Sequence, residues 1–295
     1  VRDKLKISHA HLAKINPRII TCSVTGFGET GPDKHQVAFD IVTQAISGGM
    51  SITGQPDSLP TRAGIPIGDI SGGLMGVIGV LSALIAREQT GRGQHVDISM
   101  LDAQISMLNY MVTMHFLSGI IPEQRGNAHF VHVPYNAYPV QDGYIIVAVL
   151  TDDFWKMLLR VVDLPELDTP ENEKQPGRLK NQAHIDQRLG EVFQTNTQAY
   201  WLEKLEAGRI PSAPVNNLQQ ALTNAQVKAR NMVVEVKQPG GETVKIPGNP
   251  IKLSGMDEET YTSPPSLGQH TDDVLKSLLD KSDDEIAALR ESGVI

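Results

Sequence analysis

The most informative stretch of the sequence is Gly91-Arg92-Gly93-Gln94-His95-Val96-Asp97-Ile98-Ser99-Met100-Leu101-Asp102-Ala103. A glycine turn leads into a short strand over 95–99, and apolar residues at helical spacing predict a helix over 100–117. A second strand is expected over 18–24, and a glycine-rich helix capped by Asp69 or Ser71 should connect the two. This order of strand, helix and strand predicts parallel pairing and an α/β fold.

Asp102 is expected in the first turn of the helix that follows the strand. The helix dipole and the free backbone amides keep a carboxylate ionised at such a position. An ionised carboxylate held in place is what nucleophilic attack on a thioester requires. However, Ser99-x-x-Asp102 is also the pattern of a capping box, in which the acid bonds back to the cap amide. Spacing alone favours this structural interpretation.

Four glycines lie in the connecting helix, at Gly72, Gly73, Gly76 and Gly79. Glycine lowers helix propensity, so we expect the backbone of a neighbouring element to approach the helix closely here.

After Pro134 the sequence pattern changes from strand–helix units to paired strands. Strands expected over 135–140 and 144–150 flank a turn and predict a hairpin. We therefore expect part of a large α/β domain over 1–133, a small α+β domain over 134–218, and a segment over 219–295 that returns to the large domain. Two parallel strands make a poor sheet, so an N-terminal stretch of the body is expected to be absent from this chain or supplied by another.

Composition narrows the class of protein. The chain has 295 residues, of which 40% are hydrophobic and 20% charged, with a formal net charge of −8. An acidic surface disfavours nucleic acid and anionic membranes as partners. No apolar run is expected to approach the roughly 20 residues that span a bilayer, so no membrane partner is expected. A single cysteine excludes an intramolecular disulfide and suits a reducing compartment, the cytoplasm or the mitochondrial matrix. Cys22 itself lies in an apolar run, which predicts a buried, inert thiol.

The segment Gly26–Gly31 matches the dinucleotide-binding pattern G-x-G-x-x-G after a strand. Pro32 follows at once, and the stretch 45–53 lacks the carboxylate that should hold a ribose. The pattern therefore indicates a glycine-rich turn. The nine histidines show no metal-ligand spacing, so no metal is expected.

Several segments, taken in order, resemble CoA-transferase family III, which also contains formyl-CoA transferase, carnitine CoA-transferase and alpha-methylacyl-CoA racemase. The segments that match are 16–20, 26–32, 39–40, 68–79, 91–103, 142–144, 210–216 and 267–271. The resemblance implies a Rossmann-like large domain and an interlocked homodimer. It also implies that Asp102 attacks an acyl-CoA and then carries CoA as an aspartyl thioester to a carboxylic acid. Acyl-CoA would be a substrate, with no tightly bound cofactor.

The resemblance also assigns further residues. Phe39 stands where the racemases have a histidine and cannot move a proton, which argues against a racemase. Residues 125–129 stand in the place of the family's glycine-rich loop over the active site, and His129-x-x-His132-Val133-Pro134-Tyr135 resembles the branch that uses succinyl-CoA and a dicarboxylic acid. The residues expected to bind substrate are Asp40, Gly126, Asn127 and His129, and those expected to bind CoA are Gly26 and Gly28. Asp40 as a helix-start carboxylate and His129 as an ordinary loop histidine remain open, as do a racemase and an inactive fragment or CoA-binding module.

Overall fold

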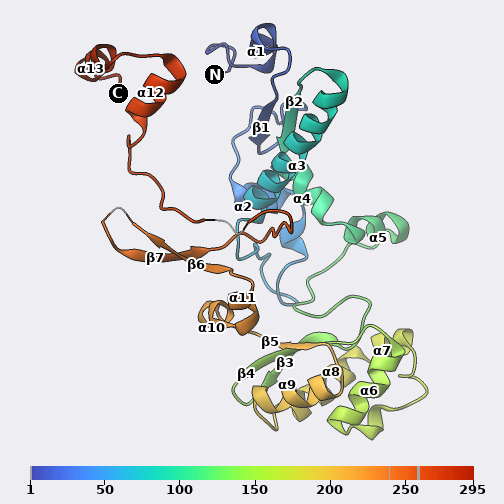
Figure 1. The fold of residues 1–295 in the computed structure, drawn as a ribbon. Helices are drawn as coiled ribbons and strands as arrows, with labels where there is room; N and C mark the ends of the chain where they lie inside the picture. The colour runs from blue at the N-terminus through green and yellow to red at the C-terminus, as the bar shows by residue number, and fades with distance from the viewer. Residues whose placement is uncertain (1, 239, 258–259) are drawn as a thin grey trace. The chain divides into compact units, whose positions relative to one another are not determined.

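The computed structural model describes residues 2–238, 240–257 and 260–295. The chain divides into two compact units, Val1–Pro214 and Val215–Ile295 (Figure 1). The mixed helix and strand content, with one parallel strand pair, confirms the predicted α/β class. The predicted return of residues 219–295 to the large domain stays a prediction.

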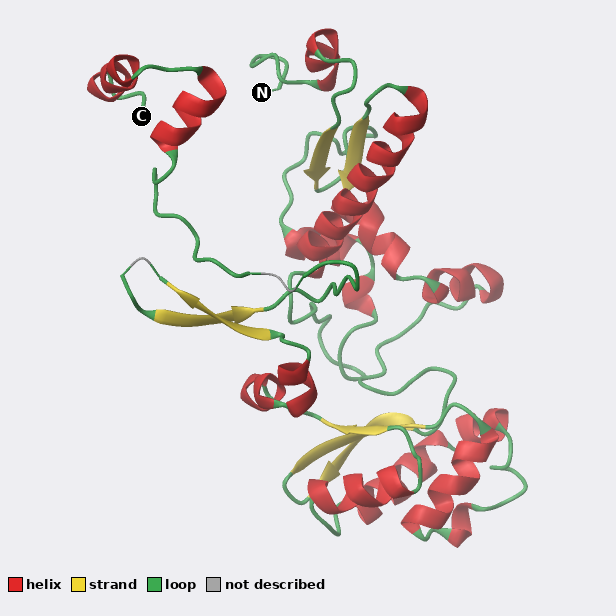
Figure 2. Cartoon of the chain, viewed as in Figure 1, coloured by secondary structure: helices red, strands yellow, loops and turns green. Residues whose placement is uncertain are grey.

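The first unit contains a parallel strand pair. Strands β1 (Thr21–Thr25) and β2 (His95–Ser99) run in register from Thr21 opposite His95 to Thr25 opposite Ser99. Within the described part of the chain these two strands form a sheet of their own. The helices of this region are α1 (His9–Ile15), α2 (Asp40–Ile46), the short 3-10 helix η1 (Gly49–Ser51) and α3 (Ile67–Thr90) (Figure 2).

Helix α3 packs directly on the strand pair because glycines face it. A Cβ atom at Gly76 would lie 3.4 Å from Val24 Cγ2, and one at Gly79 would lie 2.6 Å from Val96 Cγ1. A close neighbour is thus present at these two glycines, but side chains make the approach rather than the predicted backbone, and a Cβ at Gly73 would meet nothing within 4 Å. The prediction for Cys22 is wrong, because its side chain is exposed. Cys22 and Val24 lie on the same face of β1 and both are exposed, so this face is only partly covered in the described structure.

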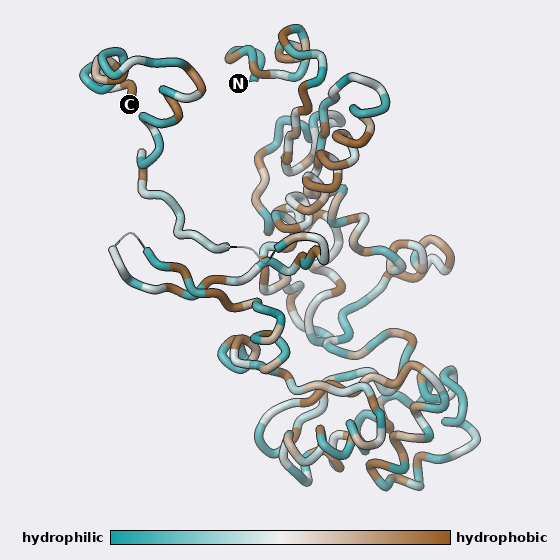
Figure 3. The backbone as a smooth tube through the Cα atoms, viewed as in Figure 1, coloured by the Kyte–Doolittle hydropathy of each residue, from teal (hydrophilic) through white to brown (hydrophobic). Residues whose placement is uncertain are grey.

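The opposite face of α3 is apolar and exposed. The exposed apolar side chains on this helix are Ile70, Leu74, Val77, Ile78, Leu81 and Ile85. Figure 3 shows hydrophobic positions in brown along the length of α3. By length and composition α3 could cross a membrane, which corrects the expectation that no apolar run is long enough. Small residues such as Gly and Ser interrupt the run and hide it from inspection. One such helix is weak support for a membrane protein, because core helices of globular proteins have the same composition.

The helix expected over 100–117 is divided in two. Helix α4 (Met100–Met107) ends before Asn109, and α5 (Tyr110–Ser118) begins after it. Asn109 has φ 48° and ψ −118°, a conformation that no α-helix contains. Apolar spacing continues across this break, so the sequence pattern does not reveal it.

The predicted small α+β domain is the best-packed part of the first unit. Strands β3 (Tyr135–Val140), β4 (Gly143–Ala148) and β5 (Ser212–Pro214) form an antiparallel sheet in that order. The predicted hairpin is confirmed by the β3–β4 pairing. The main cluster of buried apolar side chains, including Trp155 and Trp201, lies between residues 133 and 210. The helices around it are α6 (Asp152–Val162), η2 (Pro165–Leu167), α7 (Gln175–Lys180), α8 (Gln182–Phe193) and α9 (Gln198–Ala207).

A buried arginine forms hydrogen bonds with several segments of this domain. Arg178 is 0% exposed, and its guanidinium lies 5.5 Å from the ring of Trp155. All five N–H donors of the guanidinium find acceptors. These acceptors are Val133 O, Asn172 O, Glu173 O, Asp152 Oδ1 and Gln175 Oε1, at 2.8–3.1 Å. A buried charge is tolerated when its donors are satisfied in this way.

The second unit contains short helices and one hairpin. Strands β6 (Val233–Lys237) and β7 (Thr243–Pro247) pair antiparallel. The helices of this unit are α10 (Leu218–Thr223), α11 (Ala225–Ala229), α12 (Thr271–Leu279) and α13 (Asp283–Glu291).

Candidate active site

The carboxyl ends of β1 and β2 lie side by side, because the two strands are parallel and in register. The loop Gly26–Gly31 leaves β1 there, and α4 with Asp102 leaves β2 at the same edge. In open α/β sheets, ligands bind outside the carboxyl ends of the strands. We therefore expect a ligand-binding or catalytic site at this edge of the sheet.

The glycine loop is tied to the start of α4. The carbonyl oxygen of Gly26 accepts hydrogen bonds from Leu101 N at 3.0 Å and from Ser99 Oγ at 3.4 Å. Gly28 has φ +83°, and a Cβ at Gly26 would lie 2.4 Å from Ala38 Cβ. The turn thus requires glycine for its shape, as the sequence predicts. No helix follows it before α2 begins at Asp40, so the dinucleotide pattern lacks its helix. The predicted CoA contacts of Gly26 and Gly28 stay predictions.

Asp102 forms half of a capping box. Its backbone N–H donates to Ser99 Oγ at 3.1 Å, as the capping interpretation predicts. The Ser99 N–H donates no hydrogen bond to the Asp102 carboxylate, whereas the Ser282–Glu285 pair of α13 makes both bonds of a capping box. The Asp102 side chain is exposed and makes no hydrogen bond or ion pair with the described residues. Its carboxylate is therefore open to a ligand in the first turn of a helix.

Both carboxylate oxygens of Asp40, unlike those of Asp102, accept hydrogen bonds from the protein. Its Oδ1 accepts from Gly68 N at 2.7 Å and its Oδ2 from Gln44 Nε2 at 2.7 Å. The first bond caps the start of α3 from a distant part of the chain. The predicted cap from Asp69 or Ser71 is wrong, because α3 begins earlier, at Ile67, and has no side-chain cap of its own. Asp40 also opens α2, as the helix-start interpretation predicts, and its role in substrate binding stays a prediction.

Sequence inspection missed one buried polar group near Asp40. Gln104 is 6% exposed, and its Nε2 atom has no hydrogen-bond partner within the described residues. A Cβ at Gly68 would lie 2.9 Å from this atom and 3.0 Å from Asp40 Oδ1, so the groups share one small space. A glutamine in the apolar repeat of a helix is the signal that could have indicated it.

The loop that contains Gly126, Asn127 and His129 is fastened at its first part to the segment 53–55. Gly126 N donates to Gly54 O at 2.8 Å, and Gln124 Nε2 donates to Thr53 O at 2.6 Å. Gly126 has φ +61°, which favours glycine. Asn127 is exposed. No hydrogen bond, ion pair or ring contact between described residues joins this loop to Asp102.

His129 lies in an aromatic cluster at the end of this loop. Its ring stacks on Phe130, with centroids 4.6 Å apart, and lies 4.8 Å from the ring of His132. Its Nδ1 accepts hydrogen bonds from Val131 N at 3.0 Å and His132 N at 3.1 Å. Burial lowers the pKa of His129, and the nearby His132 and Arg125 lower it further.

A cavity of about 710 Å³ adjoins this cluster. Most of its lining is apolar, and Arg125 and Glu123 are the charged groups at its wall. The lining residues are Ile52, Tyr110, Met111, Met114, His115, Leu117, Ser118, Ile120, Ile121, Pro122, Glu123, Arg125, Gly126, Ala128 and Phe130. Helix α5, which supplies many of them, was predicted as a helix but not as a cavity wall.

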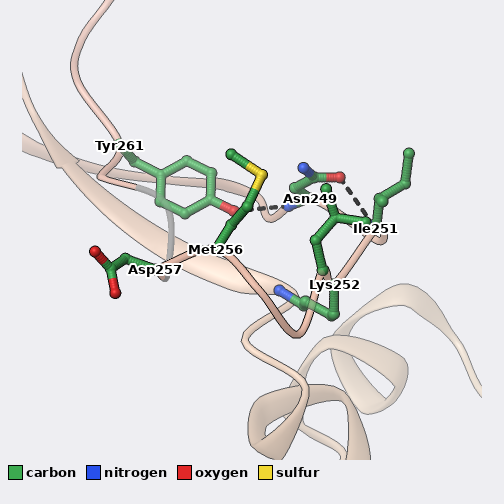
Figure 4. A pocket seen from close by; sticks show the side chains of 7 residues that line it. Asn249, Ile251, Lys252, Met256, Asp257 and Tyr261 are labelled. Carbon is green, nitrogen blue, oxygen red and sulfur yellow. Dashed lines mark hydrogen bonds between the residues drawn. The ribbon is translucent and has the colours of Figure 1, made fainter.

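The second unit has a smaller cavity of about 290 Å³ (Figure 4). The Tyr261 hydroxyl accepts from Asn249 N at 2.8 Å, and Asn249 Oδ1 accepts from Ile251 N at 2.9 Å. Lys252 and Asp257 also line it. These contacts are local turn geometry and indicate no chemistry.

The described residues do not provide a racemase base at position 39 or a cluster of metal ligands. Phe39, which stands at the racemase histidine position, is 79% exposed and has no titratable group. Over the part of the chain that the structure describes, no three His, Cys, Asp or Glu side chains gather to hold a metal ion.

Comparison with known proteins identifies relatives. Residues 1–271 match the family model described as CoA-transferase family III. The chain is 36% identical to acetyl-CoA:oxalate CoA-transferase of Acetobacter aceti over 88% of this chain and 66% of that protein. It is 31% identical to succinyl-CoA:glutarate CoA-transferase of Homo sapiens over 98% of this chain and 66% of that protein. The chain thus spans just under two thirds of the length of these relatives.

A solved structure shows the same fold. A CAIB/BAIF family protein from Brucella suis superposes with a TM-score of 0.80 at 32% identity. The superposition covers 92% of this chain and 71% of that one.

Proposed function

The chain belongs to CoA-transferase family III, and on that premise we propose that it moves coenzyme A from an acyl-CoA to a dicarboxylic acid, with Asp102 as the nucleophile. The two curated relatives described above are named for oxalate and for glutarate, and both are dicarboxylic acids. Succinyl-CoA is the donor that we propose, as in the name of the second relative.

The observation that carries this proposal is the free carboxylate of Asp102. It is exposed, unpaired among the described residues and placed in the first turn of α4. Other acids of this region, such as Asp40 and Asp97, accept hydrogen bonds from backbone amides. A carboxylate that acts as a nucleophile needs free oxygen lone pairs, and Asp102 has them.

The reaction proceeds in four balanced acyl transfers. An Asp102 oxygen attacks the thioester carbonyl, which forms a mixed anhydride and expels CoA thiolate. The thiolate attacks the aspartyl carbonyl, which releases the donor acid and leaves an aspartyl-CoA thioester. The acceptor carboxylate then attacks this thioester and expels the thiolate again, and the thiolate attacks the acceptor carbonyl and frees Asp102. Each step passes through an oxyanion that nearby N–H donors would stabilise.

Trapping the thioester tests the proposal. The protein is incubated with succinyl-CoA and then with hydroxylamine, and the modified residue is mapped by mass spectrometry. We expect a hydroxamate at Asp102 and none in Asp102→Ala. The matched control is Asp153→Ala, which removes another exposed acid from the first turn of a helix and should leave the adduct in place. A folded wild type that binds CoA and forms no adduct would leave Asp102 as a helix cap.

Three further features belong to the same proposal. Acyl-CoA is a substrate that arrives and leaves, and no cofactor stays bound. The protein works as an interlocked homodimer, which family membership supports and light scattering can test. A reducing compartment suits a chain with one cysteine, and localisation of a tagged protein tests this.

A further inference from the structure

The parallel strand pair has one polar face, and the glycine loop 26–31 folds back over it. Side chains alternate along a strand, so His95, Asp97 and Ser99 of β2 point to the same side of the pair. Val96 points to the other side, where its Cγ1 would lie 2.6 Å from a Cβ on the facing glycine of α3. One face of β2 therefore packs on the helix, and the other face is available to the loop.

Each of the three polar side chains of β2 bonds to the loop. The bonds join His95 Nε2 to Glu29 Oε1 at 3.0 Å, Asp97 Oδ2 to Glu29 N at 3.0 Å, and Ser99 Oγ to Gly26 O at 3.4 Å. Gly28 is buried against these side chains, because a Cβ at this position would lie 3.5 Å from Ser99 Cβ. The loop is thus fastened to β2 both at Gly26 and at Glu29.

Asp97 makes the bond that holds the backbone in the middle of the loop. The Glu29 N–H donates to Asp97, and the Gly28 N–H donates to Thr25 Oγ1 at 2.8 Å. The N–H groups of residues 27, 30 and 31 donate to no residue that the structure describes. Without the Asp97 acceptor, the bond to Thr25 would be left to hold the amides of these loop residues.

The loop also shares a ring of hydrogen bonds with the start of α4. Gly26 O accepts from Leu101 N at 3.0 Å and from Ser99 Oγ at 3.4 Å. Ser99 Oγ in turn accepts from Asp102 N at 3.1 Å. Glu29 is three residues from Gly26, so a displacement of the loop at Glu29 moves Gly26 O as well. Such a displacement changes the backbone contacts of the residue that carries the nucleophilic carboxylate.

We propose that Asp97 is a positioning residue, which accepts the Glu29 amide and thereby holds the loop 26–31 against the start of α4, beside Asp102. This inference rests on the proposed function, because it names a residue that sets the geometry around the nucleophile. Asp97 forms no bond with the substrate, and its task is to accept one hydrogen bond. The side-chain oxygen of an asparagine can perform this task, whereas an alanine cannot.

Three single variants test the inference by turnover. Asp97→Ala removes the acceptor, and kcat/KM for CoA transfer from succinyl-CoA to glutarate should fall by about 10- to 100-fold, as loss of a hydrogen bond to a charged group predicts. Asp97→Asn keeps an acceptor oxygen without the charge and should stay within about fivefold of wild type. The matched control is Val96→Ala, which weakens the packing of the same strand on its other face. It should lower the unfolding midpoint and keep kcat/KM within about twofold of wild type.

Two further measurements separate positioning from stability. In amide hydrogen exchange, the peptide 26–31 should exchange faster in Asp97→Ala than in wild type, because the Glu29 N–H has lost its acceptor, and Val96→Ala should leave this peptide unchanged. In a double-mutant cycle, Asp97→Ala and Ser99→Ala should together lower kcat/KM by less than the product of their separate effects. Both side chains act through the loop, and residues in one network are not additive.

The outcomes distinguish this inference from the proposed function. Unchanged exchange of the peptide 26–31 in Asp97→Ala would overturn the inference, whatever the activity. Losses of kcat/KM that are equal in Asp97→Ala and Asp97→Asn would assign the effect to the charge and also overturn it. Equal losses in Asp97→Ala and Val96→Ala would reduce Asp97 to a stabilising residue of the strand. A wild type that transfers no CoA, together with faster exchange in Asp97→Ala, would refute the proposed function and leave Asp97 as the anchor of the loop.

Discussion

Replacing Arg178 should destabilise the small domain strongly. The guanidinium is 0% exposed and satisfies five acceptors, three of them backbone carbonyls. Arg178→Met fits the same volume but leaves those carbonyls without donors and Asp152 without its buried partner. Breaking one side of a buried ion pair costs about 3–5 kcal/mol. Arg178→Lys keeps the charge but has at most three donors, so at least two acceptors stay unpaired, at about 2–4 kcal/mol in total.

Urea unfolding followed by tryptophan fluorescence measures this loss. Both tryptophans of the chain, Trp155 and Trp201, lie in the buried cluster of the small domain, so the signal reports on that domain. The matched control is Arg188→Met, because Arg188 is 33% exposed and pairs with glutamates at the surface. Such pairs contribute about 0–1 kcal/mol. If Arg178→Met lost no more free energy of unfolding than Arg188→Met, the reasoning about the buried network would be refuted.

Two other predictions concern the strand pair and its glycine loop. Gly79→Ala should lower the free energy of unfolding, because its Cβ would lie 2.6 Å from Val96 Cγ1. Gly73→Ala should raise it by about 0.5–1 kcal/mol, because no atom lies within 4 Å of the added Cβ and alanine favours the helix. Equal effects of the two substitutions in urea melts would contradict this packing. A hydrogen bond from Arg2 lowers the pKa of Glu29 from its ordinary 4.5 to about 2, so this carboxylate adds stability above pH 4.5 that is lost as the pH falls toward 2. Glu29→Gln should therefore be less stable than wild type by about 1–3 kcal/mol at pH 7 and nearly equal to it at pH 2, and a gap that is independent of pH would refute this.

Much of the fold could be predicted because local patterns agree with tertiary packing. A glycine turn precedes the strand at 95–99, turn residues follow the strand at 135–140, and the glycines of α3 indicate a close neighbour. The break at Asn109 could not be predicted, because apolar spacing continues through it. The exposure of Cys22 could not be predicted either, because a β-branched run looks the same whether or not its flank is covered.

The candidate site was predictable only in part, since spacing identifies a position and not its partners. Ser99-x-x-Asp102 indicates a cap, and only the three-dimensional arrangement shows that one of the two capping bonds is absent. The use of Asp40 as the cap of α3 depends on a contact between residues 28 positions apart. The two amides that fix the tautomer of His129 depend on how the loop folds back on its own side chain.

The anchoring of the loop before β3 has a consequence for its motion. The carbonyl of Val131 accepts from Gln175 Nε2, and that of Val133 accepts from Arg178 Nε, so α7 holds both. We therefore expect residues 129–135 to unfold together with the small domain, whereas Gln124 and Gly126 bond to the segment 53–54 and should exchange with that segment. Amide hydrogen exchange should divide the loop at this boundary. Any movement of residues 119–128 would then leave residues 129–135 attached to α7.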